Sequence, residues 1–168
     1  EGESFIKMKC SIADFNVELK NLDSKAIDFF SKYAADFERA DFTISVTEED
    51  IQKEAQLTEE KISYLNRIVA AYQRKFCEHI YAKDAFLMHA ALISVDDNGI
   101  AFLAKSGTGK TTHTLLWKKL LGERLTIING DKPIIRIIDG KAFAYGTPWC
   151  GKEGFSENKK VKLSHICF

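Results

Sequence analysis

A glycine-rich loop between an apolar strand and a helix constrains this sequence more than any other feature. The loop is Ala104-Lys105-Ser106-Gly107-Thr108-Gly109-Lys110-Thr111, which fits the phosphate-loop pattern except that Ala104 stands where the first glycine is usual. The residues before it, Ile100–Leu103, predict a strand, and a helix is expected from about Gly109 to Leu121, ended by Gly122. Strand, loop, helix and a further strand are typical of an α/β fold.

The residue types in this loop suit phosphate binding. Gly107 and Gly109 allow backbone amides to approach phosphate oxygens with no Cβ in the way. Lys110 would reach the β- and γ-phosphates, and the hydroxyl of Thr111 would ligate Mg²⁺. The alternative is a glycine-rich turn with an incidental lysine, but the spacing, the strand before it and the amphipathic helix after it favour phosphate binding. We therefore predict a site for ATP and Mg²⁺, with further contacts from the loop and the first helical turn at Ser106, Thr108 and Thr112.

An acidic residue follows the next strand. Leu125–Ile128 is expected to be that strand, and Asp131 follows it by the short step typical of a metal-binding carboxylate in nucleotide-dependent enzymes. The run Asn129–Pro133 is also typical of an ordinary turn. We predict that Asp131 shares Mg²⁺ with Thr111, and the plain turn is the alternative.

The N-terminal half predicts a small α+β module. Residues 5–20 predict a β-hairpin, residues 26–33 a helix and residues 41–46 a strand. Thr47–Asp50 resembles a helix cap, and a longer helix capped by Thr58 is expected to turn one apolar stripe into the core. The stripe consists of Ile62, Leu65, Val69, Tyr72, Phe76 and Ile80.

The pattern changes near residue 84, where we place a domain boundary. Phe86–Val95 predicts a strand, residues 96–99 a turn, and residues 134–138 and 142–145 two more strands. We therefore expect an N-terminal module over residues 1–84, which ends in the long helix, and a nucleotide-binding core over residues 85–168.

Composition narrows the classes of function. Lys plus Arg equals Asp plus Glu at 24 each, so no basic excess indicates nucleic acid or an anionic membrane as a partner. The sequence starts without Met and stops at Ile166-Cys167-Phe168, which is compatible with a C-terminally truncated core. The cysteines lack the spacing of a metal site or disulfide framework and predict reduced thiols in a cytoplasmic protein: Cys10, Cys77, Cys150 and Cys167.

Several of these motifs together resemble a known group of enzymes. Met88-His89-Ala90-Ala91, with His89 lying 21 residues before Lys110, is similar to the catalytic domain of HPr kinase/phosphorylase. Three further runs more narrowly resemble the HPr-kinase-related, phosphoenolpyruvate-carboxykinase-like proteins, some of which accompany peptide-modification systems and phosphorylate serine hydroxyls. These runs are Gly107–Thr114, Asn129–Pro133 and Tyr145–Lys152, and the resemblance covers roughly residues 86–165.

The resemblance implies a P-loop kinase core of the HPr-kinase/phosphoenolpyruvate-carboxykinase type. Its activity would be nucleotide-dependent transfer of phosphate to a serine hydroxyl of a protein or peptide. It makes His89 an active-site residue near the transferred phosphate, whereas a histidine on an apolar strand is more often a core residue. Lys152, in a glycine-flanked loop, is either a clamp for phosphate or substrate or a solvated lysine. Lys110, His89 and Asp131 are the expected catalytic residues.

One departure from this family leaves the general base open. HPr kinases carry two adjacent acidic residues after this strand, one of which deprotonates the acceptor serine, and here the first of them is Gly130. Asp131 could combine both duties, or His89 or a residue beyond Phe168 could act as the base. Two other functions stay open: a regulatory module that binds nucleotide without transfer, and a carboxykinase acting on a small organic acid. The carboxykinase would need an arginine cluster, and no arginine lies in the motif loops.

Overall fold

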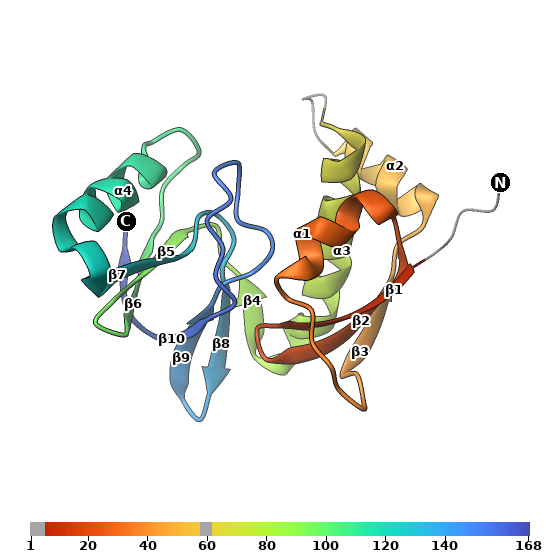
Figure 1. The fold of residues 1–168 in the computed structure, drawn as a ribbon, viewed down its shortest axis with the longest axis horizontal. Coiled ribbons are helices and arrows are strands. Elements are labelled where there is room, and N and C mark those ends of the chain that lie inside the picture. Colours follow the sequence, from red (N-terminus) through yellow and green to blue (C-terminus); the bar gives the residue numbers. More distant parts are fainter. Residues whose placement is uncertain (1–5, 58–61) are drawn as a thin grey trace. The chain divides into compact units, whose positions relative to one another are not determined.

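The chain forms two compact units, Glu1–Ile80 and Tyr81–Phe168. The computed structural model describes residues 6–57 and 62–168. In Figure 1 the first unit runs from red to yellow-green and the second from green to blue. The boundary placed near residue 84 lies just inside the second unit, directly before its first strand.

The first unit contains a three-stranded sheet. β1 (Ile6–Ile12) and β2 (Phe15–Leu22) form the predicted antiparallel hairpin, and β3 (Phe42–Ser45) pairs with β2 in parallel. Ala13 and Asp14 connect β1 to β2 and have φ values of 53° and 59°. Positive φ at both positions suits a two-residue turn, because it matches the right-handed twist of the paired strands.

The helices of this unit follow the predicted order. A 3-10 turn and α1 (Ile27–Ser31) precede β3, and α2 (Glu48–Gln56) and α3 (Tyr64–Ile80) follow it. Thr47 and Asp50 cap α2 as expected, since each side chain accepts a hydrogen bond from the other residue's backbone N–H. Of the predicted stripe, Val69, Tyr72, Phe76 and Ile80 are buried in α3, Leu65 is partly buried, and Ile62 lies before the helix begins. The rings of Phe42 and Phe76 lie 5.5 Å apart in this core. The cap predicted at Thr58 lies outside the described residues.

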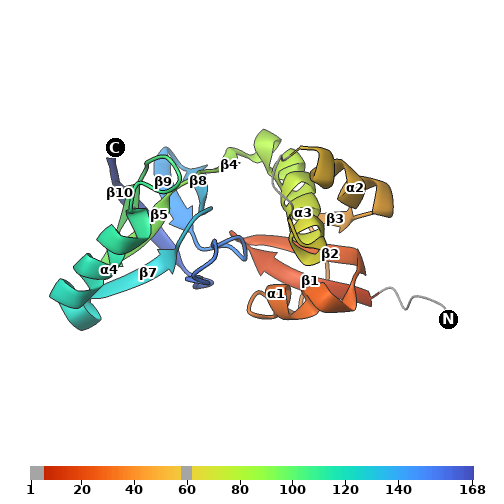
Figure 2. The ribbon, with the colours of Figure 1, turned by 90° about the horizontal axis from the view of Figure 1, so that it is seen from above.

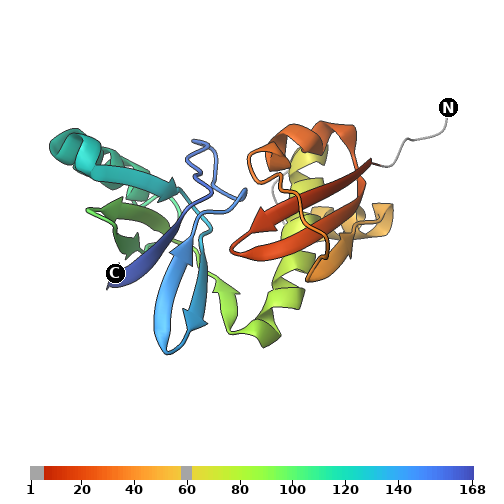
Figure 3. The same cartoon turned by 60° about the horizontal axis from the view of Figure 1, so that its bottom comes forward.

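The second unit is built on a seven-stranded mixed sheet (Figure 3). The parallel pair is β6 (Asn98–Phe102) and β10 (Lys160–Cys167), and the other neighbouring strands are antiparallel. This unit is mixed α/β, as predicted, although the sequence reasoning did not identify β10. The spatial order is β4-β8-β9-β10-β6-β5-β7, and the strands are β4 (Ala85–Leu87), β5 (Ala91–Val95), β6 (Asn98–Phe102), β7 (Leu125–Asn129), β8 (Ile134–Ile138), β9 (Lys141–Tyr145) and β10 (Lys160–Cys167).

A single crossover carries the phosphate loop. β6 and β7 both pair antiparallel with β5, so they run parallel to each other, and α4 (Lys110–Leu121) connects them. Figure 2 shows α4 alongside β7. The helix is less amphipathic than expected, because Thr114 is its buried residue, whereas Leu115, Leu116 and Leu120 are exposed.

The strand predicted over Phe86–Val95 is interrupted. β4 and β5 are separated by a break from Met88 to Ala90, in which the chain follows the loop after β7. The N–H of Ala90 donates to the carbonyl of Asp131, and that of Met88 to the carbonyl of Pro133, each at 2.9 Å. These bonds satisfy the backbone where the strand stops and bring the break beside Asp131.

The turn predicted over residues 96–99 is confined to its first two residues. Asp96 and Asp97 form the turn with positive φ, and Asn98 already pairs with Val95. Aspartate tolerates this left-handed conformation better than most residues, so the next two residues are free to begin β6.

The cysteines are free thiols, as the sequence predicts. Burial raises the pKa of the Cys10 thiol to about 12, so this side chain stays protonated and unreactive near neutral pH. In the part of the chain that the structure describes, no helix combines the length and apolar character needed to cross a bilayer.

Candidate functional site

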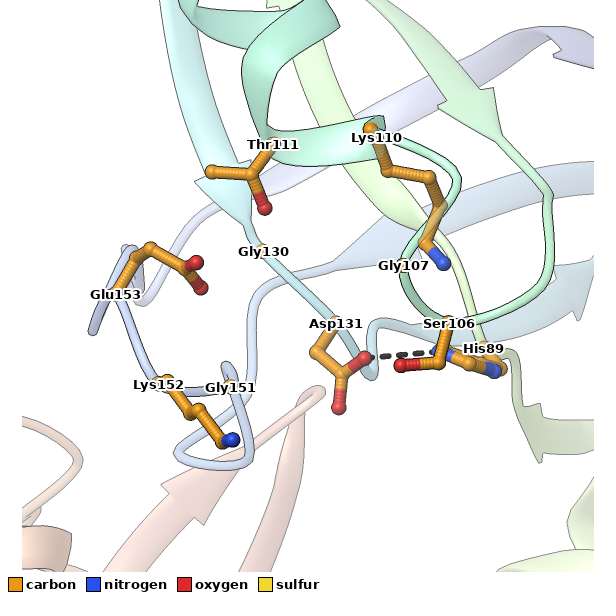
Figure 4. Close-up of a pocket in the computed structure, with 11 residues that line it drawn as sticks. His89, Ser106, Gly107, Lys110, Thr111, Gly130, Asp131, Gly151, Lys152 and Glu153 are labelled. Atoms are coloured by element: carbon orange, nitrogen blue, oxygen red, sulfur yellow. Dashed lines mark ion pairs between the residues drawn. The ribbon is translucent and has the colours of Figure 1, made fainter.

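The phosphate loop, the break before β5, the end of β7 and the loop after β9 surround one cavity of about 400 Å³ (Figure 4). The cavity contains every site residue predicted from the sequence except Thr108 and Thr112. Residues more than 60 positions apart therefore meet at one place in the fold. The lining residues are His89, Ser106, Gly107, Gly109, Lys110, Thr111, Gly130, Asp131, Gly151, Lys152 and Glu153.

Two glycines give the phosphate loop its shape. Gly107 and Gly109 have φ values of 81° and 96°, and a Cβ at either position would meet no atom within 4 Å. The need for glycine is therefore conformational, since other residues rarely adopt this backbone. Ala104 does not have positive φ, so alanine is compatible with the first position of the pattern. Gly109 caps α4, whose first amides have no acceptor within the helix.

Lys110 bonds to its own loop. Its ammonium donates to the carbonyl of Ala104 at 2.7 Å and to that of Lys105 at 3.4 Å. Thr108 also donates its hydroxyl to the Lys105 carbonyl, at 2.7 Å, so its side chain stabilises the loop and does not line the cavity. A bound phosphate would replace these carbonyls as the partner of the ammonium group.

Asp131 lies at the centre of the polar contacts in the cavity. His89 Nε2 is 3.0 Å from Asp131 Oδ1, and Lys132 donates its ammonium hydrogen to Oδ2 at 2.6 Å. Figure 4 shows the His89 and Asp131 side chains pointing toward each other across the cavity. The exposed fraction is 48% for the His89 side chain and 25% for that of Asp131. His89 therefore lies in a solvent-accessible site and not in the apolar core.

A buried turn fixes the position of Asp131. The side-chain oxygen of Asn129 accepts the N–H groups of Asp131 at 3.0 Å and Lys132 at 2.7 Å. The Asn129 amide in turn donates to Thr147, both to its carbonyl at 3.0 Å and to its hydroxyl oxygen at 3.2 Å. Asn129 and Thr147 are completely buried. The sequence left open whether residues 129–133 form an ordinary turn or present a metal-binding carboxylate. In the structure Asn129 does form a turn, and this turn directs the Asp131 side chain into the cavity.

Replacement of Asn129 by alanine is expected to lower the free energy of unfolding by about 2–4 kcal/mol, because buried N–H groups lose their acceptor. Urea unfolding would measure the loss. Asn98→Ala is the matched control, since Asn98 is exposed and bonds only at the surface; we expect it to cost about 0.5 kcal/mol or less. Equal losses in the two variants would contradict a positioning role for the buried turn.

Gly130 has no room for a side chain. A Cβ at this position would lie 2.6 Å from the carbonyl oxygen of Cys150, and the Gly130 N–H donates to the carbonyl of Phe155 at 2.9 Å. The loop after β9 therefore packs directly on the backbone here. A side chain at position 130 would therefore require this loop or the turn after β7 to move.

The same loop contributes a carboxylate that the sequence reasoning missed. Gly151 and Gly154 have φ values of 82° and 71°, and the Gly154 N–H donates to the Gly151 carbonyl at 3.4 Å. Lys152 and Glu153 are the two central residues of this turn and line the cavity. The signal was the Gly-Lys-Glu-Gly run itself, in which only the lysine was considered.

Comparisons with known proteins identify no relative of this chain. No protein-family model matches the sequence. A search of curated proteins also finds no match. Within residues 6–57 and 62–168, no group of three or more His, Cys, Asp or Glu side chains could hold a metal ion alone.

Proposed function

We propose that this protein is a nucleotide-dependent phosphotransferase that binds Mg-ATP in the cavity beside α4. The observation that supports this most is the arrangement of one cavity: a phosphate loop with left-handed glycines, the start of a helix, and Asp131 and His89 facing it. Such a loop and helix start favour phosphate oxygens through backbone amides and the positive end of the helix dipole.

Mg²⁺ fits the donors present. Thr111 and Asp131 line the same cavity and offer a hydroxyl and a carboxylate oxygen, the hard ligands that Mg²⁺ prefers. Mg²⁺ commonly uses one or two protein oxygens and takes its remaining ligands from phosphates and water, so no larger acidic cluster is needed. When bound, the ion would neutralise charge on the phosphates.

The basic residues have separate roles in this proposal. Lys110 exchanges its loop carbonyls for the β- and γ-phosphates, and Lys152 approaches the phosphates from the opposite loop. His89 and Lys132 hold the Asp131 carboxylate in place through one oxygen each. Each Asp131 oxygen keeps a second lone pair, so the carboxylate could bind the metal while these contacts persist.

We propose a serine hydroxyl of a protein or peptide as the acceptor, in a P-loop kinase core of the HPr-kinase/phosphoenolpyruvate-carboxykinase type. The resemblance of the motifs supports this choice, and free thiols suit a cytoplasmic protein. A carboxykinase has less support, because none of the described residues that line the cavity is an arginine. Nucleotide binding without transfer is favoured by one observation, that Gly130 stands where the resemblance places the first acid of the pair.

The test has two stages. Calorimetric titration with Mg-ATP and Mg-ADP should give saturable binding, and labelled γ-phosphate should then appear on degenerate peptides with a single central serine. Binding without any ADP formation would support the regulatory module in place of the kinase. Absence of binding would contradict the nucleotide site itself.

A further inference from the structure

We propose that Glu153 is the general base that deprotonates the acceptor hydroxyl in this cavity. This inference rests on the proposed phosphotransferase function and addresses the question that Gly130 leaves open. It assigns the second carboxylate of the site to a different segment of the chain, the turn after β9.

Gly130 cannot supply that carboxylate, for a physical reason. The Cys150 carbonyl occupies the space where a Cβ of residue 130 would stand, and the next three residues of the same loop line the cavity. The segment that excludes an acid at position 130 is therefore also the segment that carries Glu153.

The turn brings Glu153 close to Asp131. A Cβ built on Gly151 would lie 3.7 Å from the carboxyl carbon of Asp131 and 3.8 Å from Glu153 Oε2. The two carboxyl groups are thus no further apart than these two distances added together. Figure 4 shows the Glu153 carboxylate turned toward the cavity on its Thr111 side. The two acids therefore line the same cavity close enough to act on one bound substrate.

Glu153 differs from Asp131 in how far its carboxylate is engaged by other side chains. Asp131 Oδ2 accepts a hydrogen bond from Lys132, and Oδ1 lies 3.0 Å from His89 Nε2. Asp131 is therefore the more engaged of the two carboxylates. Within the described part of the chain, Glu153 makes no hydrogen bond or ion pair, and its side chain is exposed at the cavity mouth, where an acceptor arrives from solvent.

The reaction balances with ATP as the donor. The acceptor hydroxyl gives its proton to a Glu153 carboxylate oxygen, and its oxygen forms a bond to the γ-phosphorus. The bond between the γ-phosphorus and the β,γ-bridging oxygen breaks, and its electron pair leaves with ADP. Glu153 then returns the proton to solvent. General bases of this kind contribute roughly 100-fold or more to rate.

The experiment compares Glu153→Gln with Glu123→Gln, an exposed glutamate outside the cavity. Calorimetry measures Mg-ATP affinity, and ADP formation is followed with the serine-centred peptide pool, so that transfer to peptide and to water are both counted. We expect Glu153→Gln to bind Mg-ATP within about twofold of wild type and to form ADP about 100-fold more slowly, whereas Glu123→Gln matches wild type on both. Added formate should partly restore the rate of Glu153→Ala, which a purely structural role would not allow.

Each other outcome overturns the assignment. A normal rate in Glu153→Gln removes Glu153 from the chemistry while the phosphotransferase function stands. A parallel loss of Mg-ATP affinity makes Glu153 a ligand of the metal or nucleotide and not a base. If the wild-type protein binds Mg-ATP but forms no ADP, the transfer function is contradicted. The assignment of Glu153 as general base is then contradicted as well.

Discussion

Lys110→Ala is expected to weaken Mg-ATP binding by about 100-fold or more, because it removes the cation that pairs with the β- and γ-phosphates. The fold should be unaffected, since the Lys110 ammonium contacts only the carbonyls of its own loop. Calorimetric titration measures the affinity, and urea unfolding of the same samples checks stability. The two readouts together separate a lost ligand contact from a damaged protein.

Lys119→Ala provides the matched control for this variant. Lys119 lies exposed in the last turn of the same helix and does not line the cavity. It carries the same charge at the far end of α4, so its removal should leave Mg-ATP affinity within about twofold of wild type. If the two lysine variants bind Mg-ATP equally well, the phosphate loop is not the nucleotide site.

Gly130→Asp is expected to damage the protein instead of restoring an acidic pair. The new Cβ would lie 2.6 Å from the Cys150 carbonyl, so either the loop after β9 or the turn after β7 must move. We expect the free energy of unfolding to fall by about 3 kcal/mol, as for an overpacked interior, and no gain in phosphate transfer. Urea unfolding and the ADP assay measure the two effects.

The control for Gly130→Asp is Gly154→Ala, in the same loop. Gly154 has positive φ, but a Cβ there would meet nothing within 4 Å, so only backbone strain of about 1 kcal/mol is expected. Gly130→Ala should fall near the aspartate variant, since both share the Cβ. A stable Gly130→Asp protein with faster transfer would contradict the close packing of the loop and would point to a missing base at position 130.

Local chemistry was predictable wherever a few neighbouring residues decide it. The cap of α2 needs only Thr47 and Asp50, and the α3 stripe needs only helical spacing. The phosphate loop between β6 and α4 likewise follows from its own glycines and flanking periodicity. The strand and helix that flank the loop lie close to their predicted bounds, whereas α3 begins at Tyr64, so Ile62 of the predicted stripe precedes it.

Features that depend on distant partners were not predictable in this way. Phe86–Val95 looks continuous, yet the chain leaves the strand at Met88 because backbone groups of Asp131 and Pro133 are available as partners. The place of Glu153 depends on where the Cys150 carbonyl meets Gly130, a contact across 20 residues. Only the alternation of Val161 and Leu163 hinted at β10, and nothing local fixed its neighbours.

The position of β10 has a consequence for biosynthesis. It is the latest strand of the sequence to leave the ribosome, yet it lies at the middle of the seven, between β9 and β6. Until it emerges, the nascent chain holds two separate three-stranded groups with unpaired inner edges, which are prone to pair wrongly.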